Sequence, residues 1–189
     1  KSKTRLAEAL DHPARMRLVR CLYRRTLDVL APVADAAGAD LAAVTASADA
    51  ARLAHARGIR VIDEEGDGLC AAAMEAARIA ADSYDRLCVI PADLATPAPE
   101  DFLKLLNSQA AVTVCPSNDQ GTNALVVAPP DALPFQYGPN SALLHLKEAK
   151  ARGLTTCLKQ LERLPFDIDT SVCLSRAMRD VPEIADACA

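Results

Sequence analysis

Two aspartates, Asp167 and Asp169, lie in the apolar stretch LPFDIDTSVCL with one isoleucine between them. Removing a carboxylate from water is costly, so such a group finds a cationic partner or changes its pKa. In an extended segment residues i and i+2 share a face, so the two side chains would point the same way. A third aspartate, Asp93, follows the hydrophobic run LCVIPAD. We interpret the three as a hard-oxygen site suited to Mg²⁺, which binds one or two carboxylates together with substrate phosphates.

Each of these aspartates also has a purely structural interpretation. Asp169 or Thr170 could cap a helix that begins near Val172, and Asp93 could accept backbone hydrogen bonds in a turn. For one aspartate taken alone, capping is favoured. Open α/β sheets bind ligands beyond the carboxyl ends of their strands, and three aspartates together at that edge favour the metal site.

Two glycine-containing segments could hold an anion. In NDQGTNALVV, backbone N–H groups and the hydroxyl of Thr122 are available beside Gly121 and Asn123. In FQYGPNSALLH, Gly138 and Ser141 precede a helix, and a helix N-terminus attracts phosphate. The local sequence favours an ordinary hairpin turn for the first segment and leaves a plain N-cap role open for Ser141.

Other residues with chemical potential are few. KSKTR contains Lys3 and Arg5, and its cations could clamp a triphosphate or form a solvated chain end. His145 lies between leucines with no acid or cysteine at catalytic spacing, so we interpret it as a packing or surface residue and not as a base. The G-x-S-x-G, Walker A, H-E-x-x-H and G-x-G-x-x-G patterns are absent from the sequence, which removes support for those enzyme classes.

Composition excludes several broad classes of protein. The formal charge of −4 over 189 residues is too small to favour binding to nucleic acid or to an anionic membrane. There is no apolar run of roughly 18 residues and no signal-peptide pattern at the start. The seven cysteines include no C-x-x-C pair, so they are interpreted as core thiols in a reducing cytoplasm. The length predicts a single domain over residues 1–189.

Helical patterns alternate with short apolar runs from one end of the chain to the other. Helices are predicted over residues 13–30, 47–58, 67–83, 96–106, 138–153 and a C-terminal stretch, and strands over 40–46, 59–62, 85–93, 110–116, 124–128 and around Ile168. This alternation predicts an α/β fold, a three-layer sandwich with a mostly parallel central sheet. The chain opens with a charged segment leading into a helix, so either the first strand is absent or the fold begins differently.

Five segments occur in an order typical of one enzyme family: KSKTRLAEAL, VIPADL, GTNALVVAPP, FQYGPNSALLHLKEAKARGL and FDIDT. Together they resemble the 2-phospho-L-lactate guanylyltransferase family, called phosphoenolpyruvate guanylyltransferase in bacteria, which serves coenzyme F(420) biosynthesis. The resemblance spans nearly the whole chain. It implies a nucleotidyltransferase domain with the nucleotide-diphospho-sugar transferase (glycosyltransferase-A-like) fold. Such an enzyme joins GTP to 2-phospho-L-lactate, phosphoenolpyruvate or 3-phosphoglycerate and releases pyrophosphate.

The resemblance also implies roles for individual residues, by their place in the family's pattern. The carboxylates that hold Mg²⁺ in catalysis would be Asp93, Asp167 and Asp169. The pocket for the phosphorylated acid would comprise Thr122, Gly138 and Ser141, with Asn123 beside them. The GTP phosphates would face Lys3 and Arg5. A metal-assisted attack of this kind needs no protein nucleophile.

The chain departs from the family pattern in three places, one of them ADLAT at residues 92–96, where ADLPL is more usual, and other functions remain open. The family's opening strand and its lysine-bearing turn lie upstream of Lys1, and Cys70 stands where family members usually have asparagine. The alternatives are another nucleotidyltransferase of the same fold, of molybdenum-cofactor or sugar-phosphate type, and a non-catalytic nucleotide-binding relative. The expected partners are GTP and a small phosphorylated acid, without nucleic acid or membrane. The oligomeric state stays open, a homodimer included.

Overall fold

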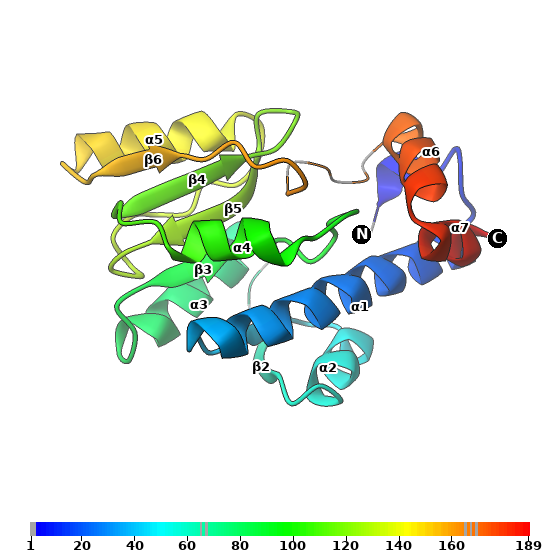
Figure 1. Cartoon of the computed structure of the whole chain (residues 1–189), viewed down its shortest axis with the longest axis horizontal. Coiled ribbons are helices and arrows are strands. Elements are labelled where there is room, and N and C mark those ends of the chain that lie inside the picture. The colour runs from blue at the N-terminus through cyan, green and yellow to red at the C-terminus, as the bar shows by residue number, and fades with distance from the viewer. Residues whose placement is uncertain (1–2, 65, 67, 165, 167, 169) are drawn as a thin grey trace.

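Helices and strands alternate along the chain (Figure 1), and the computed structural model describes residues 3–64, 66, 68–164, 166, 168 and 170–189. The helices are the short 3-10 helix η1 (Thr4–Leu6), α1 (His12–Ala37), α2 (Ala48–His55), α3 (Leu69–Ala81), α4 (Pro99–Leu106), α5 (Ser141–Ala151), α6 (Ser171–Asp180) and α7 (Pro182–Cys188). The strands are β1 (Ala42–Thr45), β2 (Arg60–Asp63), β3 (Leu87–Val89), β4 (Val112–Pro116), β5 (Thr122–Val127) and β6 (Thr156–Leu158).

The strands form two sheets. β1 and β2 pair in parallel, and the other four strands lie in the order β3-β5-β4-β6. β5 is antiparallel to both of its neighbours, whereas β6 is parallel to β4, so three of these four strands run in one direction. The predicted α/β fold with mostly parallel strands is confirmed. The strand pairing divides the expected central sheet into two parts, because no ladder among the described residues joins β1 or β2 to β3.

The four-stranded sheet is the middle of three layers. Along β5, Leu125 and Val127 pack into a core with residues of α3 and α5. The alternate residues Ala124 and Val126 pack into a second core with residues of α1 and α4. Since successive side chains of a strand point to opposite faces, this alternation covers both faces of the sheet with helices. All six residues of β5 are buried, as expected for a strand at the centre of such a sandwich.

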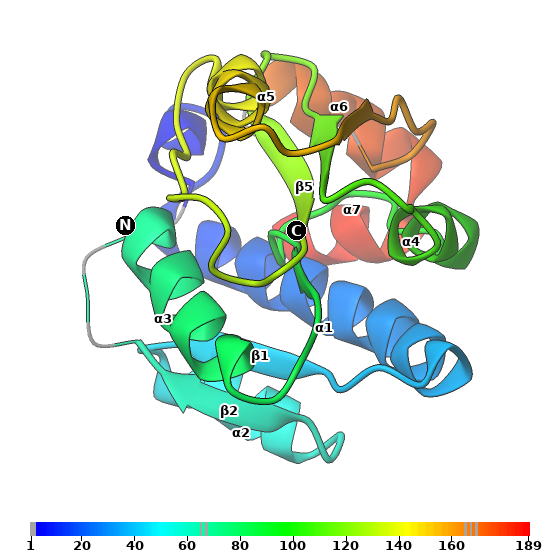
Figure 2. The ribbon, with the colours of Figure 1, turned by 90° about the vertical axis from the view of Figure 1, so that its left-hand side faces the viewer.

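Helix α1 lies between the two sheets: Figures 1 and 2 show it running between the four-stranded sheet and the β1–β2 pair. The helix begins after Asp11, whose carboxylate accepts a hydrogen bond from the Ala14 amide at 2.8 Å. It continues beyond the predicted end at residue 30, past Pro32, and stops at Gly38, which has φ 64°. Buried Val33 and Ala34 follow the proline, so tertiary packing maintains a helix that the local signal would have ended.

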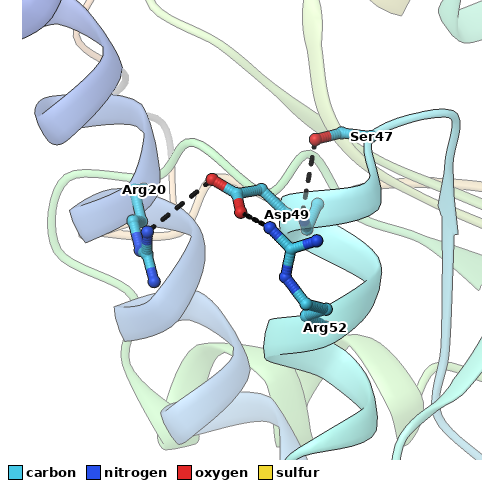
Figure 3. Close-up of polar contacts among 5 residues, drawn as sticks. Arg20, Ser47, Asp49 and Arg52 are labelled. Carbon is cyan, nitrogen blue, oxygen red and sulfur yellow. Dashed lines mark hydrogen bonds and ion pairs between the residues drawn. The ribbon is translucent and has the colours of Figure 1, made fainter.

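A charged cluster on the surface links α1 to α2 (Figure 3). Asp49 in the first turn of α2 lies between Arg20 of α1, at 3.6 Å, and Arg52 of its own helix. Ser47 caps α2 by accepting a hydrogen bond from the Ala50 amide. All three charged side chains are more than half exposed, so water screens their attraction and the cluster contributes little to stability.

Two expectations from the sequence are corrected by the strand pairing. Ile168 is not in a strand; it is fully buried in a core formed by α1, α6 and α7 with Phe166 and Ala95. The last strand is β6, which pairs with β4 and was not predicted. A three-residue strand carries too short an apolar pattern to be recognised locally, because its stability comes from the neighbouring strand. Among the described residues, every helix is too short or too polar to cross a membrane.

Candidate active site

Asp93 lies in the segment that follows β3, and the structure fixes this segment from two sides. The Thr26 hydroxyl of α1 donates to the Ala92 carbonyl at 3.5 Å, and the Ala95 amide donates to the Phe166 carbonyl at 3.2 Å. Leu94 and Ala95 are fully buried. Their burial anchors the segment and leaves the Asp93 side chain 42% exposed, so that it can meet a ligand.

The cation beside Asp93 in this structure is Lys3. Its ammonium lies 2.8 Å from Asp93 Oδ2, and its side chain is only 5% exposed. The sequence predicted that Lys3 faces nucleotide phosphates, and the structure brings it to one of the predicted metal ligands. A divalent ion that bound Asp93 would compete with this ammonium for the carboxylate, because both are attracted by the same charge.

The other two predicted metal ligands, Asp167 and Asp169, lie outside the described residues. Thr170 fills the capping role that the sequence left open, since its hydroxyl accepts from the Cys173 amide at 3.2 Å. The described residues contain no group of three or more metal-ligating side chains. Asp93 supplies the hard oxygen that suits Mg²⁺, and the complete metal site stays a prediction.

Thr122 and Ser141, both predicted to bind the acid, meet in the structure although 19 positions separate them. Their hydroxyl oxygens are 2.9 Å apart, and His145 Nδ1 lies 3.2 Å from Thr122 Oγ1. Thr122 is 6% exposed, and Ser141 and His145 are fully buried. Ser141 is not the N-cap of α5, since Asn140 holds that place with φ 58°. Its hydroxyl points instead to β5.

The same site continues into the segment before Gly138. His145 Nε2 accepts from the Gln136 amide at 2.9 Å, and the Cys70 sulfur accepts from the Tyr137 amide at 3.2 Å. Two consecutive backbone N–H groups are therefore held by side chains of α5 and α3. Gly138 follows them with φ 136°, a conformation that residues with a side chain rarely adopt. Cys70 thus positions the segment that carries a predicted acid-binding residue.

Burial of the imidazole lowers the pKa of His145 to about 4. The ring is therefore neutral at pH 7. The sequence interpretation of His145 as a packing residue holds, but its two polar contacts were not foreseen. The only sign of these contacts in the sequence was the i, i+4 spacing of Ser141 and His145, which places both side chains on one face of a helix.

The turn between β4 and β5 lies beside these groups and is an ordinary hairpin, as the sequence favoured. The Ser117 hydroxyl donates to Asp119 and is the main reason that the pKa of this carboxyl is below its usual range. The Gly121 amide and the positive charge of Arg5 also lower this pKa, whereas desolvation raises it. A Cβ atom on Gly121 would lie 2.7 Å from Ser117 Oγ. The Gln120 carbonyl accepts from the Ala142 amide at 3.3 Å, which joins the turn to α5.

Asn123, the remaining predicted residue, is buried and donates from its side-chain amide to the Leu164 carbonyl at 2.8 Å. Asp101 of α4, which the sequence interpretation did not single out, accepts from the amides of Arg163 and Leu164 at 3.1 and 3.3 Å. These contacts fix the chain just ahead of Phe166. They also attach it to the same strand, β5, that carries Thr122.

Several known proteins are similar to this chain in sequence. A 3-phospho-D-glycerate guanylyltransferase of Colwellia psychrerythraea is 35% identical over 173 residues, which cover 89% of this chain and 81% of that protein. A phosphoenolpyruvate guanylyltransferase of Rubrobacter xylanophilus is 36% identical over 183 residues, 93% of this chain and 86% of that protein. A 2-phospho-L-lactate guanylyltransferase of Methanothermobacter thermautotrophicus is 29% identical, over 90% of this chain and 75% of that protein.

The fold has a counterpart among solved structures. A crystal structure assigned as a nucleotide-diphospho-sugar transferase from Desulfovibrio desulfuricans G20 superposes with a TM-score of 0.70 at 18% identity, covering 99% of this chain and 92% of that one. This likeness confirms the predicted fold. The family described as "Guanylyl transferase CofC like" matches residues 1–179. With this match over nearly the whole chain, and relatives of up to 36% identity that are named guanylyltransferases, the chain belongs to the CofC-like guanylyltransferase family.

Proposed function

We propose that this protein joins GTP to a phosphorylated three-carbon acid, one of 2-phospho-L-lactate, phosphoenolpyruvate and 3-phosphoglycerate, and serves coenzyme F(420) biosynthesis. A phosphate oxygen of the acid attacks the α-phosphorus of GTP. A new phosphoanhydride bond forms, the bond between the α-phosphorus and the bridging oxygen breaks, and pyrophosphate leaves with that bonding electron pair. The reaction needs no redox partner and no covalent enzyme intermediate.

The observation that carries this proposal is the contact between Thr122 and Ser141, at 2.9 Å, beside exposed Gly138 and the first turn of α5. Hydroxyl groups beside a helix N-terminus, where the helix dipole places partial positive charge, favour an anion such as a phosphate or a carboxylate. The three relatives named above differ in the acid they are named for. This variation fits a common guanylyl-transfer chemistry with an acid pocket that changes from one member to another.

Lys3 and Arg5 would serve the nucleotide. Lys3 is paired with Asp93, and the charge of Arg5 acts on the turn that leads to Thr122. In this proposal Asp93, Asp167 and Asp169 hold Mg²⁺, which when bound would neutralise phosphate charge and help to align the reactants. The chain's own contribution is to orient the acid at Thr122 and Ser141 and to place cations beside the triphosphate.

The test supplies the protein with GTP, Mg²⁺ and each of the three acids in turn and follows the release of pyrophosphate. We expect release with at least one acid, and a phosphoanhydride signal from the product in ³¹P NMR. Omission of the acid, and replacement of GTP by ATP, serve as controls. Turnover with a sugar phosphate and none with the three acids would favour the alternative nucleotidyltransferase. Calorimetric binding of GTP without any release would favour a non-catalytic relative.

A further inference from the structure

Three buried polar side chains form a hydrogen-bonded chain at the start of α5, in the order His145, Thr122 and Ser141. The protonation of the array can be assigned from its contacts. The Gln136 amide donates to His145 Nε2 at 2.9 Å, so this nitrogen carries no proton. Because the ring is neutral, its one N–H is on Nδ1 and donates to Thr122 Oγ1 at 3.2 Å.

The two hydroxyl groups have one proton more than their contacts within the array use. The array holds three donor protons, on Nδ1, Thr122 and Ser141, but it has only two internal contacts. One hydroxyl proton is left over. Within the described part of the chain, the side chains of Thr122 and Ser141 make no hydrogen bonds besides these two. A buried donor without an acceptor is costly, so this proton is available to a ligand oxygen.

The opposite tautomer would remove this property. If Nδ1 accepted, Thr122 would donate to His145 and Ser141 would donate to Thr122, and both hydroxyl protons would be used internally. The Gln136 amide prevents this arrangement, since it would then meet an N–H group at Nε2. The backbone at Gln136 therefore decides whether the hydroxyl pair can donate outward.

We propose that His145 is a positioning residue for the acceptor acid: through Nδ1–H it makes Thr122 and Ser141 a net donor of one hydroxyl proton to an oxygen of the acid. The inference rests on the proposed function and deepens it, because it names the group that sets the polarity of the acid pocket. His145 also holds Gln136, two residues before Gly138, so one imidazole contacts both the hydroxyl pair and the segment that leads to Gly138.

Two substitutions separate the two contacts. In His145→Asn the side-chain amide can take the place of Nδ1–H and donate to Thr122, whereas the acceptor for Gln136 is lost. In His145→Gln the side-chain oxygen can take the place of Nε2 and accept from Gln136, whereas the donor to Thr122 is lost. We expect His145→Gln to raise KM for the acid by about three- to tenfold, the net contribution of the neutral hydrogen bond that orients the Thr122 hydroxyl toward the ligand, with KM for GTP unchanged. His145→Asn should retain more of the affinity for the acid than His145→Gln.

A spectroscopic measurement accompanies the kinetics. The chain has three histidines, so the imidazole ¹⁵N resonances of His145 can be assigned by comparison with either variant. We expect a protonated Nδ1 and an unprotonated Nε2 in the ligand-free protein at pH 7. The reverse pattern would overturn the inference whether or not the protein turns over. Equal effects of the two variants on KM for the acid, or an equal rise in KM for GTP, would also overturn it.

The proposed function and this inference fail in different ways. If none of the three acids supports pyrophosphate release, the proposed function is contradicted, and phosphoenolpyruvate binding by calorimetry replaces KM as the affinity measurement. Weaker binding by His145→Gln than by His145→Asn then supports the inference. Equal binding by both variants, or no binding by the native chain, contradicts it. Thermal unfolding of each variant verifies that the compared proteins are folded.

Discussion

Lys3 and Asp93 form an ion pair whose two members have very different exposure. The Lys3 side chain is 5% exposed, so its charge depends on protein partners, whereas Asp93 is 42% exposed and can also interact with solvent or a ligand. A buried cation beside a half-exposed carboxylate suits a site in which the carboxylate changes partner. In the proposed mechanism the same pair would have a structural role without ligand and a chemical role with it.

This dual role gives the first prediction. Asp93→Asn should abolish pyrophosphate release and also lower the free energy of unfolding by about 1–2 kcal/mol, because a buried ammonium loses a carboxylate partner. Lys3→Met added to Asp93→Asn should restore most of the stability and none of the turnover, since it removes the charge that had lost this partner. Chemical denaturation and the pyrophosphate assay measure the two effects. Equal destabilisation in the single and double variants would contradict the prediction.

The second prediction concerns Asp169, which lies outside the described residues. Asp169→Asn keeps the size of the side chain and removes its charge, so Mg²⁺-dependent turnover should be lost while the protein stays folded. The matched control is Thr170→Ser, which keeps the helix-capping hydroxyl of the next residue and should retain turnover. Pyrophosphate release over a Mg²⁺ titration, with circular dichroism to verify the fold, is the measurement. Full activity of Asp169→Asn would remove this residue from the site.

Two buried polar side chains fix the segment that leads from β6 toward α6. Asp101 of α4 accepts two backbone N–H groups of this segment, and Asn123 of β5 donates to its Leu164 carbonyl. Backbone groups in a loop that is buried must find such partners. A helix on one face of the sheet and the central strand thereby position the chain near Phe166.

The third prediction separates the two contacts of Asp101. Asp101→Ala leaves the amides of Arg163 and Leu164 without an acceptor, and it should cost about 2–3 kcal/mol in the free energy of unfolding. Lys104→Ala removes only the ion pair at 3.6 Å between the exposed Lys104 ammonium and the buried Asp101, and should cost about 0.5 kcal/mol or less because water screens the ammonium and both backbone hydrogen bonds to Asp101 remain. Chemical denaturation of both variants measures the difference. Similar losses would show that the ion pair, and not the buried hydrogen bonds, stabilises the segment.

The fourth prediction concerns the β4–β5 turn. In Gly121→Ala the new methyl group would meet Ser117 Oγ at 2.7 Å, so Ser117 must move away from Asp119. We expect a loss of about 1–2 kcal/mol in stability and weaker binding of the acid, because Thr122 is the next residue. Ser117→Ala in the same chain removes the obstructing oxygen and should recover part of both losses. No recovery in the double variant would exclude this clash as the cause.

For the fold of this chain, the sequence was sufficient for the features that local patterns encode. Alternating helices and apolar strands predicted the layered α/β fold, and the start of α5 near Ser141 was correct. The sequence was insufficient where the contacting residues are far apart along the chain. β6 is stabilised by β4, and the apolar residues around Ile168 pack on helices and not in a sheet. The contacts of His145 and Asp101 also depend on residues that only the folded chain brings near.

The stability of the whole chain should respond to acid through His145. The pKa of its imidazole is about 4 in the folded protein and 6.5 in the unfolded chain. Between these values the unfolded state binds a proton that the folded state does not, so the free energy of unfolding falls as the pH drops from 6.5 to 4. Above pH 6.5 this contribution is fully present, and below about 4 it no longer changes.

The fifth prediction follows from this difference. Burial is the cause of the lowered pKa, and Tyr137, whose ring meets the imidazole edge-on at 5.3 Å, is uncharged in this pH range. We expect the free energy of unfolding of the native chain to fall by roughly 2–3 kcal/mol through His145 as the pH drops from 7 to 4. His145→Asn should lack this loss, because asparagine does not titrate. Urea denaturation at intervals from pH 7 to pH 4 measures both curves, and their difference cancels the carboxylates common to the two proteins. Parallel curves would mean that the imidazole gains its proton without disturbing Gln136 and Thr122, and the tautomer would then not be fixed by the fold.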